Sequence, residues 1–118
     1  MVESVSQTVE FYKDVLGFEL VMTLPEEGVP DWALVRSAGV EMMFQSQASM
    51  SSEFPSFQNR PVGGSLTLYI QMEDVQEFHA RLQEKGIAVE DLNTTFYGMR
   101  EFRVPDCNGY MLVFAQQV

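Results

Sequence analysis

The stretch Val9-Glu10-Phe11-Tyr12-Lys13-Asp14-Val15-Leu16-Gly17-Phe18-Glu19-Leu20 predicts a helix that ends at a glycine and turns into a strand. Glycine ends a helix readily because it adopts the left-handed conformation without a Cβ clash. The stretch 77–90 repeats this plan, and its helix-ending Gly86 lies 69 residues after Gly17. The chain therefore contains the same helix-to-strand transition twice.

A second pair of landmarks keeps the same spacing. Gly39 precedes the apolar run 40–44, and Gly109 precedes the apolar run 110–114, so these two turn glycines lie 70 residues apart. Two landmarks in register predict a duplicated module. The groove between the halves is then the first place to look for function.

Length and charge bound the possible functions. The chain has 118 residues, which fits one domain with a shared core, and a net charge of −10 with only seven Lys and Arg residues. This charge argues against a nucleic-acid partner and allows a cationic ligand. No uncharged apolar run is long enough to span a membrane and no signal peptide is visible, so we expect no membrane partner and a cytoplasmic location. The single cysteine, Cys107, fits a reducing compartment.

Periodicity predicts the elements of module one, residues 1–45. Val5, Val9, Tyr12 and Leu16 follow helical spacing, which predicts a helix over 6–16 capped by Ser4 or Ser6. Strands are predicted over 18–24, 32–37 and 40–45.

Module two, residues 65–118, follows a Ser-, Pro- and Gln-rich connection over 46–64, whose aromatic residues favour an ordered loop. Its predicted elements are a strand over 65–72, a helix that ends at Gly86, a strand that begins at 87–89, and strands over 97–104 and 110–116. Glu73 and Asp74 are expected to cap that helix. The counterpart of the 65–72 strand would lie mostly upstream of Met1, so we expect module one to lack most of its first strand.

Three stretches resemble one known family: 8–18, 74–87 and 97–110, the last reading Tyr97-Gly98-Met99-Arg100-Glu101-Phe102-Arg103-Val104-Pro105-Asp106-Cys107-Asn108-Gly109-Tyr110. They are similar to the glyoxalase, bleomycin-resistance and ring-cleaving dioxygenase group, the vicinal oxygen chelate superfamily. The resemblance covers nearly the whole of 1–118 as a single domain. It implies an α+β fold of two tandem βαβββ modules whose curved mixed sheet surrounds a cavity, usually completed in a homodimer.

Metal-dependent members of the family hold a divalent ion with His, Gln and Glu on the first and last strands of each module. The resemblance places three of these positions at Thr67, Val113 and Met43, and a shift of two residues would move Met43 to Glu41 or Gln45. Val has no lone pair, Met is a soft thioether and a lone Thr hydroxyl is a weak ligand. We therefore expect no metal site and no cofactor.

His79 and Cys107 are the remaining candidates for catalysis. Helical spacing puts Val75, Phe78 and Leu82 on the core face, so His79 is expected on the solvated side. Cys107 lies in a turn without a nearby base, which predicts an inert thiol. Nucleophilic catalysis is thus unsupported, and the catalytic residues, if the protein is an enzyme, are unknown.

Aromatic and polar side chains near the strand ends favour ligand binding over catalysis. Aromatic rings can stack on a flat or cationic ligand, although they can equally fill the cavity or a dimer seam. The predicted ligand-binding residues are Trp32, Glu41, Met43, Thr67, Tyr69, Phe96, Tyr97, Arg100, Glu101 and Val113.

Two main functions follow. The first is a metal-free protein similar to the bleomycin-resistance branch, which sequesters an aromatic or cationic small molecule in a dimer groove. The second is a metal-dependent enzyme, a glyoxalase-type lyase or isomerase or a dioxygenase. A regulatory or partner-binding module is a third alternative.

Overall fold

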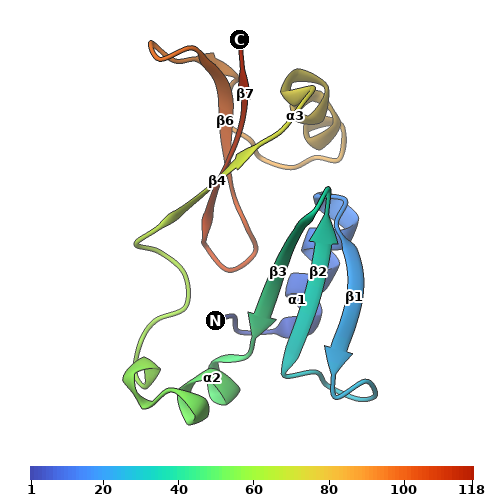
Figure 1. Ribbon diagram of the computed structural model, residues 1–118, viewed down its shortest axis with the longest axis vertical. Helices are drawn as coiled ribbons and strands as arrows, with labels where there is room; N and C mark the ends of the chain where they lie inside the picture. The colour runs from blue at the N-terminus through green and yellow to red at the C-terminus, as the bar shows by residue number, and fades with distance from the viewer. The chain divides into compact units, whose positions relative to one another are not determined.

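The computed structural model describes residues 1–118 as two compact units, unit 1 (Met1–Gly63) and unit 2 (Gly64–Val118), and each is described by itself below (Figure 1). Both contain a helix and an open sheet, so the predicted α+β class is confirmed. No helix is both long and apolar enough to cross a bilayer.

Unit 1 begins with a helix and a three-stranded antiparallel sheet in the order β1-β2-β3. Its elements are α1 (Val5–Glu10), a π-helical turn (Phe11–Val15), β1 (Glu19–Leu24), β2 (Trp32–Ser37), β3 (Val40–Gln45), α2 (Gln47–Glu53) and a 3-10 turn (Pro55–Phe57). The predicted bounds of β2 and β3 are confirmed. The connection between the modules is ordered and contains α2, a helix that the sequence analysis did not predict.

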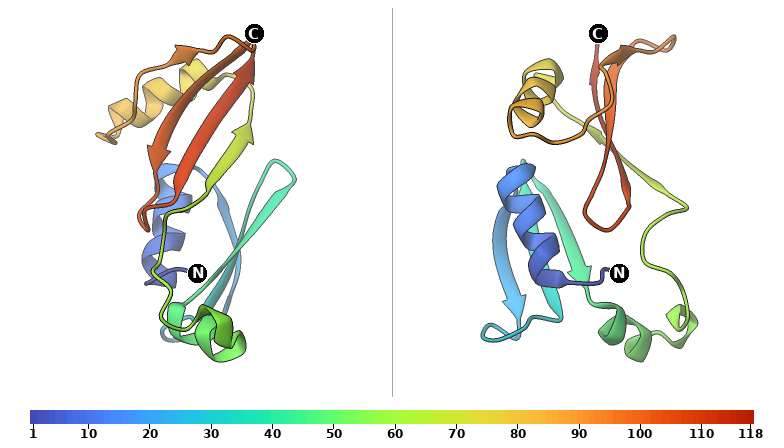
Figure 2. Two further views of the ribbon diagram at one scale, coloured as in Figure 1. Left: turned by 90° about the vertical axis from the view of Figure 1, so that its left-hand side faces the viewer. Right: turned by 180° about the vertical axis from the view of Figure 1, so that it is seen from behind.

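The first helix forms as its sequence predicts. The Ser4 hydroxyl accepts a hydrogen bond from a first-turn backbone N–H at 3.2 Å, which satisfies one of the donors that a helix start leaves open. Val5, Val9, Tyr12 and Leu16 are all buried. The Tyr12 ring lies 4.6 Å from that of Phe44 on β3, so this stripe packs against the sheet. The ribbon of α1 lies along one face of that sheet (Figure 2).

The transition from helix to strand explains why β1 starts one residue later than expected. The Leu16 N–H bonds the Phe11 carbonyl at 3.3 Å, a five-residue step typical of a π turn. Gly17 then takes a φ of +81°, and the Phe18 N–H returns to the Tyr12 carbonyl at 2.8 Å. Phe18 is therefore used to close the helix, and the strand begins at Glu19.

Unit 2 contains a four-stranded mixed sheet in the order β4-β7-β6-β5, with β4 parallel to β7 and the other pairs antiparallel. Its elements are β4 (Thr67–Gln71), α3 (Val75–Glu84), β5 (Asn93–Thr94), β6 (Met99–Pro105) and β7 (Met111–Gln117). This is the predicted βαβββ order. The chain path is visible in both views of Figure 2.

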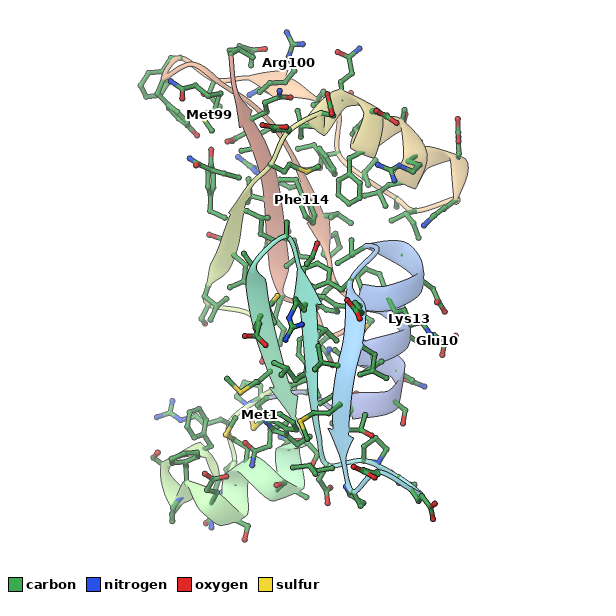
Figure 3. All side chains as sticks on the ribbon, turned by 45° about the vertical axis from the view of Figure 1, so that its right-hand side comes forward. Met1, Glu10, Lys13, Met99, Arg100 and Phe114 are labelled. Carbon is green, nitrogen blue, oxygen red and sulfur yellow. The ribbon has the colours of Figure 1, made fainter.

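Aromatic packing joins α3 to the sheet of unit 2. The Phe78 ring lies 4.9 Å from Phe114 and 6.1 Å from Phe102, and Phe102 stacks on Phe114 at 5.6 Å (Figure 3). Val75 and Leu82 are fully buried beside them. The predicted core face of this helix is confirmed.

The prediction for His79 is wrong, because His79 belongs to that core. Its side chain is buried, its ring makes an edge contact with Phe102 at 4.9 Å, and Nε2 lies 2.9 Å from the Glu90 carbonyl oxygen. One hydrogen bond satisfies the polar ring while its carbons pack, which makes the burial tolerable. His79 is a structural residue.

Of two further predictions around α3, one is wrong and the other is right only for the position of the cap. Residues 87–89 are not a strand, because the Ile87 N–H is used to close α3 through the Leu82 carbonyl at 3.0 Å. Asp74 occupies the cap position with a φ of +54°, but its side chain makes no capping bond. The Gln116 side chain from β7 accepts the Val75 N–H instead, at 3.1 Å.

The last strands of the two units share a further feature. In unit 2 the Met72 N–H donates to the Ala115 carbonyl at 2.8 Å, just after the end of β4 beside β7. In unit 1 the Val2 N–H donates to the Gln45 carbonyl at 2.9 Å, and Val2 forms a parallel bridge with Ser46. Val2 thus holds the place in unit 1 that Met72 holds in unit 2.

Candidate functional site

Strand alternation gives the sheet of unit 2 two different faces. Phe102, Leu112 and Phe114 point toward α3, so their neighbours along each strand point to the opposite face. The register pairs Tyr69 with Val113, and Glu101 with Ala115, on that helix-free face. Thr67 shares it, since it lies two residues before Tyr69. Four of the predicted ligand-binding residues, Thr67, Tyr69, Glu101 and Val113, are thereby on one surface.

A hydrogen-bonded cluster, called here the phenol–carboxylate cluster, lies on this face and consists of Tyr69, Tyr97 and Glu101. The Tyr69 hydroxyl donates to Oε2 of Glu101 at 2.8 Å, and the Tyr97 hydroxyl lies 3.3 Å from both carboxylate oxygens. Glu101 is only 6% exposed, whereas Tyr69 and Tyr97 are about half exposed. The two rings therefore hold a buried negative charge beneath a surface that a ligand can reach.

The environment of the cluster changes the acidity of one phenol. Loss of solvent around the Tyr69 hydroxyl, then its hydrogen bond to Glu101 and the negative charge of that group, raise the pKa of Tyr69 to about 12. Tyr69 thus stays protonated throughout the neutral range. It serves as a hydrogen-bond donor and not as a base.

Two other predicted residues take no part in the hydrogen bonds of this cluster. Phe96 is fully exposed, and its ring contacts only that of Tyr97, edge-on at 5.0 Å. Arg100 lies on the α3 face, where its guanidinium donates to Gln76 at 3.4 Å (Figure 3). Adjacent residues on a strand point to opposite faces, so Arg100 and Glu101 do not form a pair.

In unit 1 the helix-free face of the sheet carries the other predicted residues. Ala33 and Val35 are buried on the α1 side, so Trp32, paired with Gln45, and Met43, paired with Leu34, point away from α1. Glu41 shares that face and forms an ion pair with Arg36 at 3.2 Å.

A groove beside α2 extends this face and has a volume of about 620 Å³. Gln45 links its two walls, because its side-chain amide donates to Glu53 at 2.8 Å and to Ser49 at 3.0 Å. Sequence analysis identified Trp32 and Met43 but missed the α2 residues. The available signal was Ser46, whose hydroxyl accepts the Ser49 N–H at 3.2 Å and begins the unpredicted helix.

The positions that the resemblance assigns to metal ligands do not fit a hard divalent ion. Thr67 and Val113 on the unit 2 face offer one neutral hydroxyl and no donor at all, and Met43 offers a soft sulfur. No group of three or more His, Cys, Asp or Glu residues lies close enough together to hold an ion. The polar groups on these faces are suited to hydrogen bonding and charge pairing.

Comparison with known proteins identifies the fold. A model of the glyoxalase/bleomycin resistance protein/dioxygenase superfamily matches residues 1–114. A member of that group from Nocardioides superposes with a TM-score of 0.78 at 17% identity, over 99% of this chain and 78% of that one.

Two similar structures come from Streptomyces sp. CB03234. TnmS3, an antibiotic binding protein, has 27% identity and a TM-score of 0.73 over 99% of this chain and 91% of its own. A glyoxalase/bleomycin resistance protein has 28% identity and a TM-score of 0.70 over 98% and 93%. No curated protein has a significant match to the chain. The family match, nearly full in length, and the α+β architecture together show that this chain belongs to the glyoxalase/bleomycin resistance protein/dioxygenase superfamily.

Proposed function

We propose that this protein binds an aromatic or cationic small molecule without a metal ion, in the manner of the bleomycin-resistance branch, and does so as a homodimer. The observation that carries the proposal is the phenol–carboxylate cluster, in which Tyr69 and Tyr97 hold the buried Glu101 carboxylate on the helix-free face of unit 2. Such a cluster provides aromatic surface, hydrogen-bond donors and a negative charge at one place.

The chemistry of the cluster favours binding over turnover. Tyr69 is held protonated, and His79, which is the only histidine, is buried against Phe102 and bonded to the Glu90 carbonyl. A ligand group that carries N–H donors and positive charge can replace one phenol at Glu101, which keeps the carboxylate paired. The likeness to TnmS3, an antibiotic binding protein, supports the same class of function.

Isothermal calorimetry against a panel of glycopeptide and planar cationic antibiotics tests the proposal. We expect saturable heat for at least one cationic compound and a weaker association for Glu101→Gln. The matched control is Glu84→Gln at the exposed end of α3, which removes one carboxylate away from the cluster and is expected to leave affinity unchanged. The proposal fails if no compound gives heat, or if both variants weaken binding equally.

The metal-free part of the proposal has its own test. Protein prepared in medium supplemented with nickel, zinc and iron is expected to contain clearly less than one metal ion per chain after dialysis. A tightly held equimolar metal would instead support the glyoxalase-type lyase, isomerase or dioxygenase.

Light scattering tests the homodimer. We expect twice the mass of the chain at the concentrations used for calorimetry. A monomer that still binds a panel compound would refute the dimer and leave the ligand proposal intact.

A further inference from the structure

The groove beside α2 lies entirely within unit 1 and has the size of a small-molecule site. Its volume of about 620 Å³ is within the range of ligand pockets, which is roughly 300 to 1,000 Å³. The principal lining residues are Leu24, Asp31, Trp32, Met43, Glu53 and Phe54.

The apolar lining is accessible to a ligand. Met43 is 66% exposed, Leu24 48% and Phe54 45%, and Trp32 is half-buried beside them. Large apolar side chains gathered at one place gain free energy when a partner removes them from water. A flat aromatic molecule fits this requirement because the Trp32 indole can contribute stacking as well as burial.

The charge in the groove has a single sign. Asp31 and Glu53 line it, and no Lys or Arg does. Neither carboxylate takes part in an ion pair, and the pairs Arg36–Glu41 and Arg103–Glu90 involve other residues.

Neutral groups fix both carboxylates in place. Glu53 accepts a hydrogen bond from the Gln45 amide at 2.8 Å, and Asp31 accepts one from the Ser46 hydroxyl at 3.1 Å. These bonds orient the negative charges without neutralising them. The groove is thus prepared for a positive charge that comes from outside the chain.

The position of Glu53 adds a second reason to assign it a role. Glu53 is the last residue of α2, where the helix dipole disfavours a carboxylate. A residue that weakens its own helix and has no basic partner is a candidate for function.

We infer that the groove of unit 1 binds a planar aromatic monocation, which stacks on Trp32 and directs its charge to Glu53. This inference goes beyond the proposed function, because it names a second site, its ligand class and a specificity-determining residue from the segment that connects the modules. It needs neither the phenol–carboxylate cluster nor a second copy of the chain.

The chain carries its own reporter for this site, because Trp32 is its only tryptophan. The probes are 9-aminoacridine and acridine, compared at a pH where the first is a cation and the second is neutral. We expect saturable quenching of Trp32 emission by both, with the cation binding about tenfold more tightly.

Matched variants test whether the charge of Glu53 determines the preference for the cation. Glu53→Gln is expected to remove most of the preference for the cation, to leave acridine binding unchanged, and to leave the fold intact because the helix end loses an unfavourable charge. Glu10→Gln on α1 is the control, since Glu10 is an exposed carboxylate on the opposite side of the sheet (Figure 3). The inference is overturned if the two probes bind equally, or if both variants reduce cation binding to the same extent.

Three other outcomes separate this inference from the proposed function. If neither probe changes Trp32 emission but protein concentration does, the inference is wrong and the groove is a contact between copies of the chain. If neither probe changes Trp32 emission, while calorimetry detects an antibiotic whose binding Glu101→Gln abolishes, the groove inference alone is refuted. Absence of heat for every antibiotic would refute the proposed function whatever the probes do.

Discussion

The last strands of the two units, β3 and β7, follow the same turn glycine in the repeat but differ in their neighbours. β7 is paired on both edges, by β6 and by the parallel strand β4. β3 is paired with β2 on one edge, and in the described residues 1–118 its other edge has only the bridge between Val2 and Ser46. The same plan thus produces a central strand in unit 2 and an edge strand in unit 1. An open edge is a place where a further strand can add.

Hydrogen exchange gives the largest expected contrast. In the 118-residue chain, the β3 amides that point away from β2 are expected to exchange on the order of 10³-fold faster than β7 amides, because no ladder bond protects them. Exchange measured by NMR or mass spectrometry checks this, with β2 and β6 as paired controls that have neighbours on both edges. Equal protection of β3 and β7 would remove the distinction between the units.

Truncation in the aromatic core of unit 2 is expected to have the next largest effect. Phe102 is 1% exposed and contacts Phe78, His79 and Phe114, so Phe102→Ala should lower the free energy of unfolding by about 3–5 kcal/mol. Phe96→Ala is the control, since that side chain is fully exposed and should change stability by less than about 0.5 kcal/mol.

Urea unfolding followed both by circular dichroism and by Trp32 emission sharpens the comparison. Trp32 lies in unit 1, so a shift of its midpoint in the Phe102→Ala protein would show that the two units unfold together. A loss of stability below about 1 kcal/mol would contradict the assignment of Phe102 to the core.

The helix-ending glycines provide a test in which the units should agree. Gly17 and Gly86 have φ values of +81° and +77° and open space where a Cβ would lie. Alanine at either position should destabilise the protein by about 1–2 kcal/mol through backbone strain alone. Thermal unfolding of the two variants checks this, and a neutral effect at one position only would show that the repeat is not equivalent there.

The smallest expected effect concerns the phenol–carboxylate cluster, which has no counterpart in the groove of unit 1. The pKa of Tyr69 is raised from 10.0 to about 12 in the folded chain. Between these pH values the folded chain keeps the Tyr69 proton, whereas the unfolded chain has lost it. The corresponding stability is fully present below about pH 10 and is lost as the pH rises toward about 12. Because Tyr69 is nearly half exposed, solvent screens the effect.

As the pH rises through that range, the urea midpoint of unfolding should fall more steeply for the natural chain than for the Tyr69→Phe variant. In Glu101→Gln, tyrosinate absorbance should appear at lower pH because the negative charge is gone. Identical pH profiles for the natural chain and Tyr69→Phe would contradict the stabilising role of the hydrogen bond.

Most of the fold was accessible from the sequence, since the repeat spacing, apolar periodicity and turn glycines determine local structure. The error at His79 came from reading one helix alone. At the 70-residue spacing that relates Gly39 to Gly109, His79 corresponds to Val9, which is buried. The 69-residue spacing of the helix-ending glycines relates His79 to Glu10 instead, and Glu10 is exposed. The repeat therefore indicated burial of His79 at one of its two spacings and exposure at the other.

The candidate sites were only partly predictable. Strand alternation alone separates Arg100 from Glu101, so that distinction was available from the sequence. The hydrogen bond from Gln45 to Glu53 was not, because it depends on how α2 folds back beside β3. Contacts made by a connecting segment of this kind carry no periodic pattern.

The Gln116 side chain that closes the start of α3 joins residues 41 positions apart in the chain. Proteolytic trimming of the last three residues would release the Val75 N–H and loosen a helix that begins far upstream. A tag at the C-terminal end should therefore be separated from Gln116 by a linker, and the mass of the chain shows whether a preparation still contains the residue that caps α3.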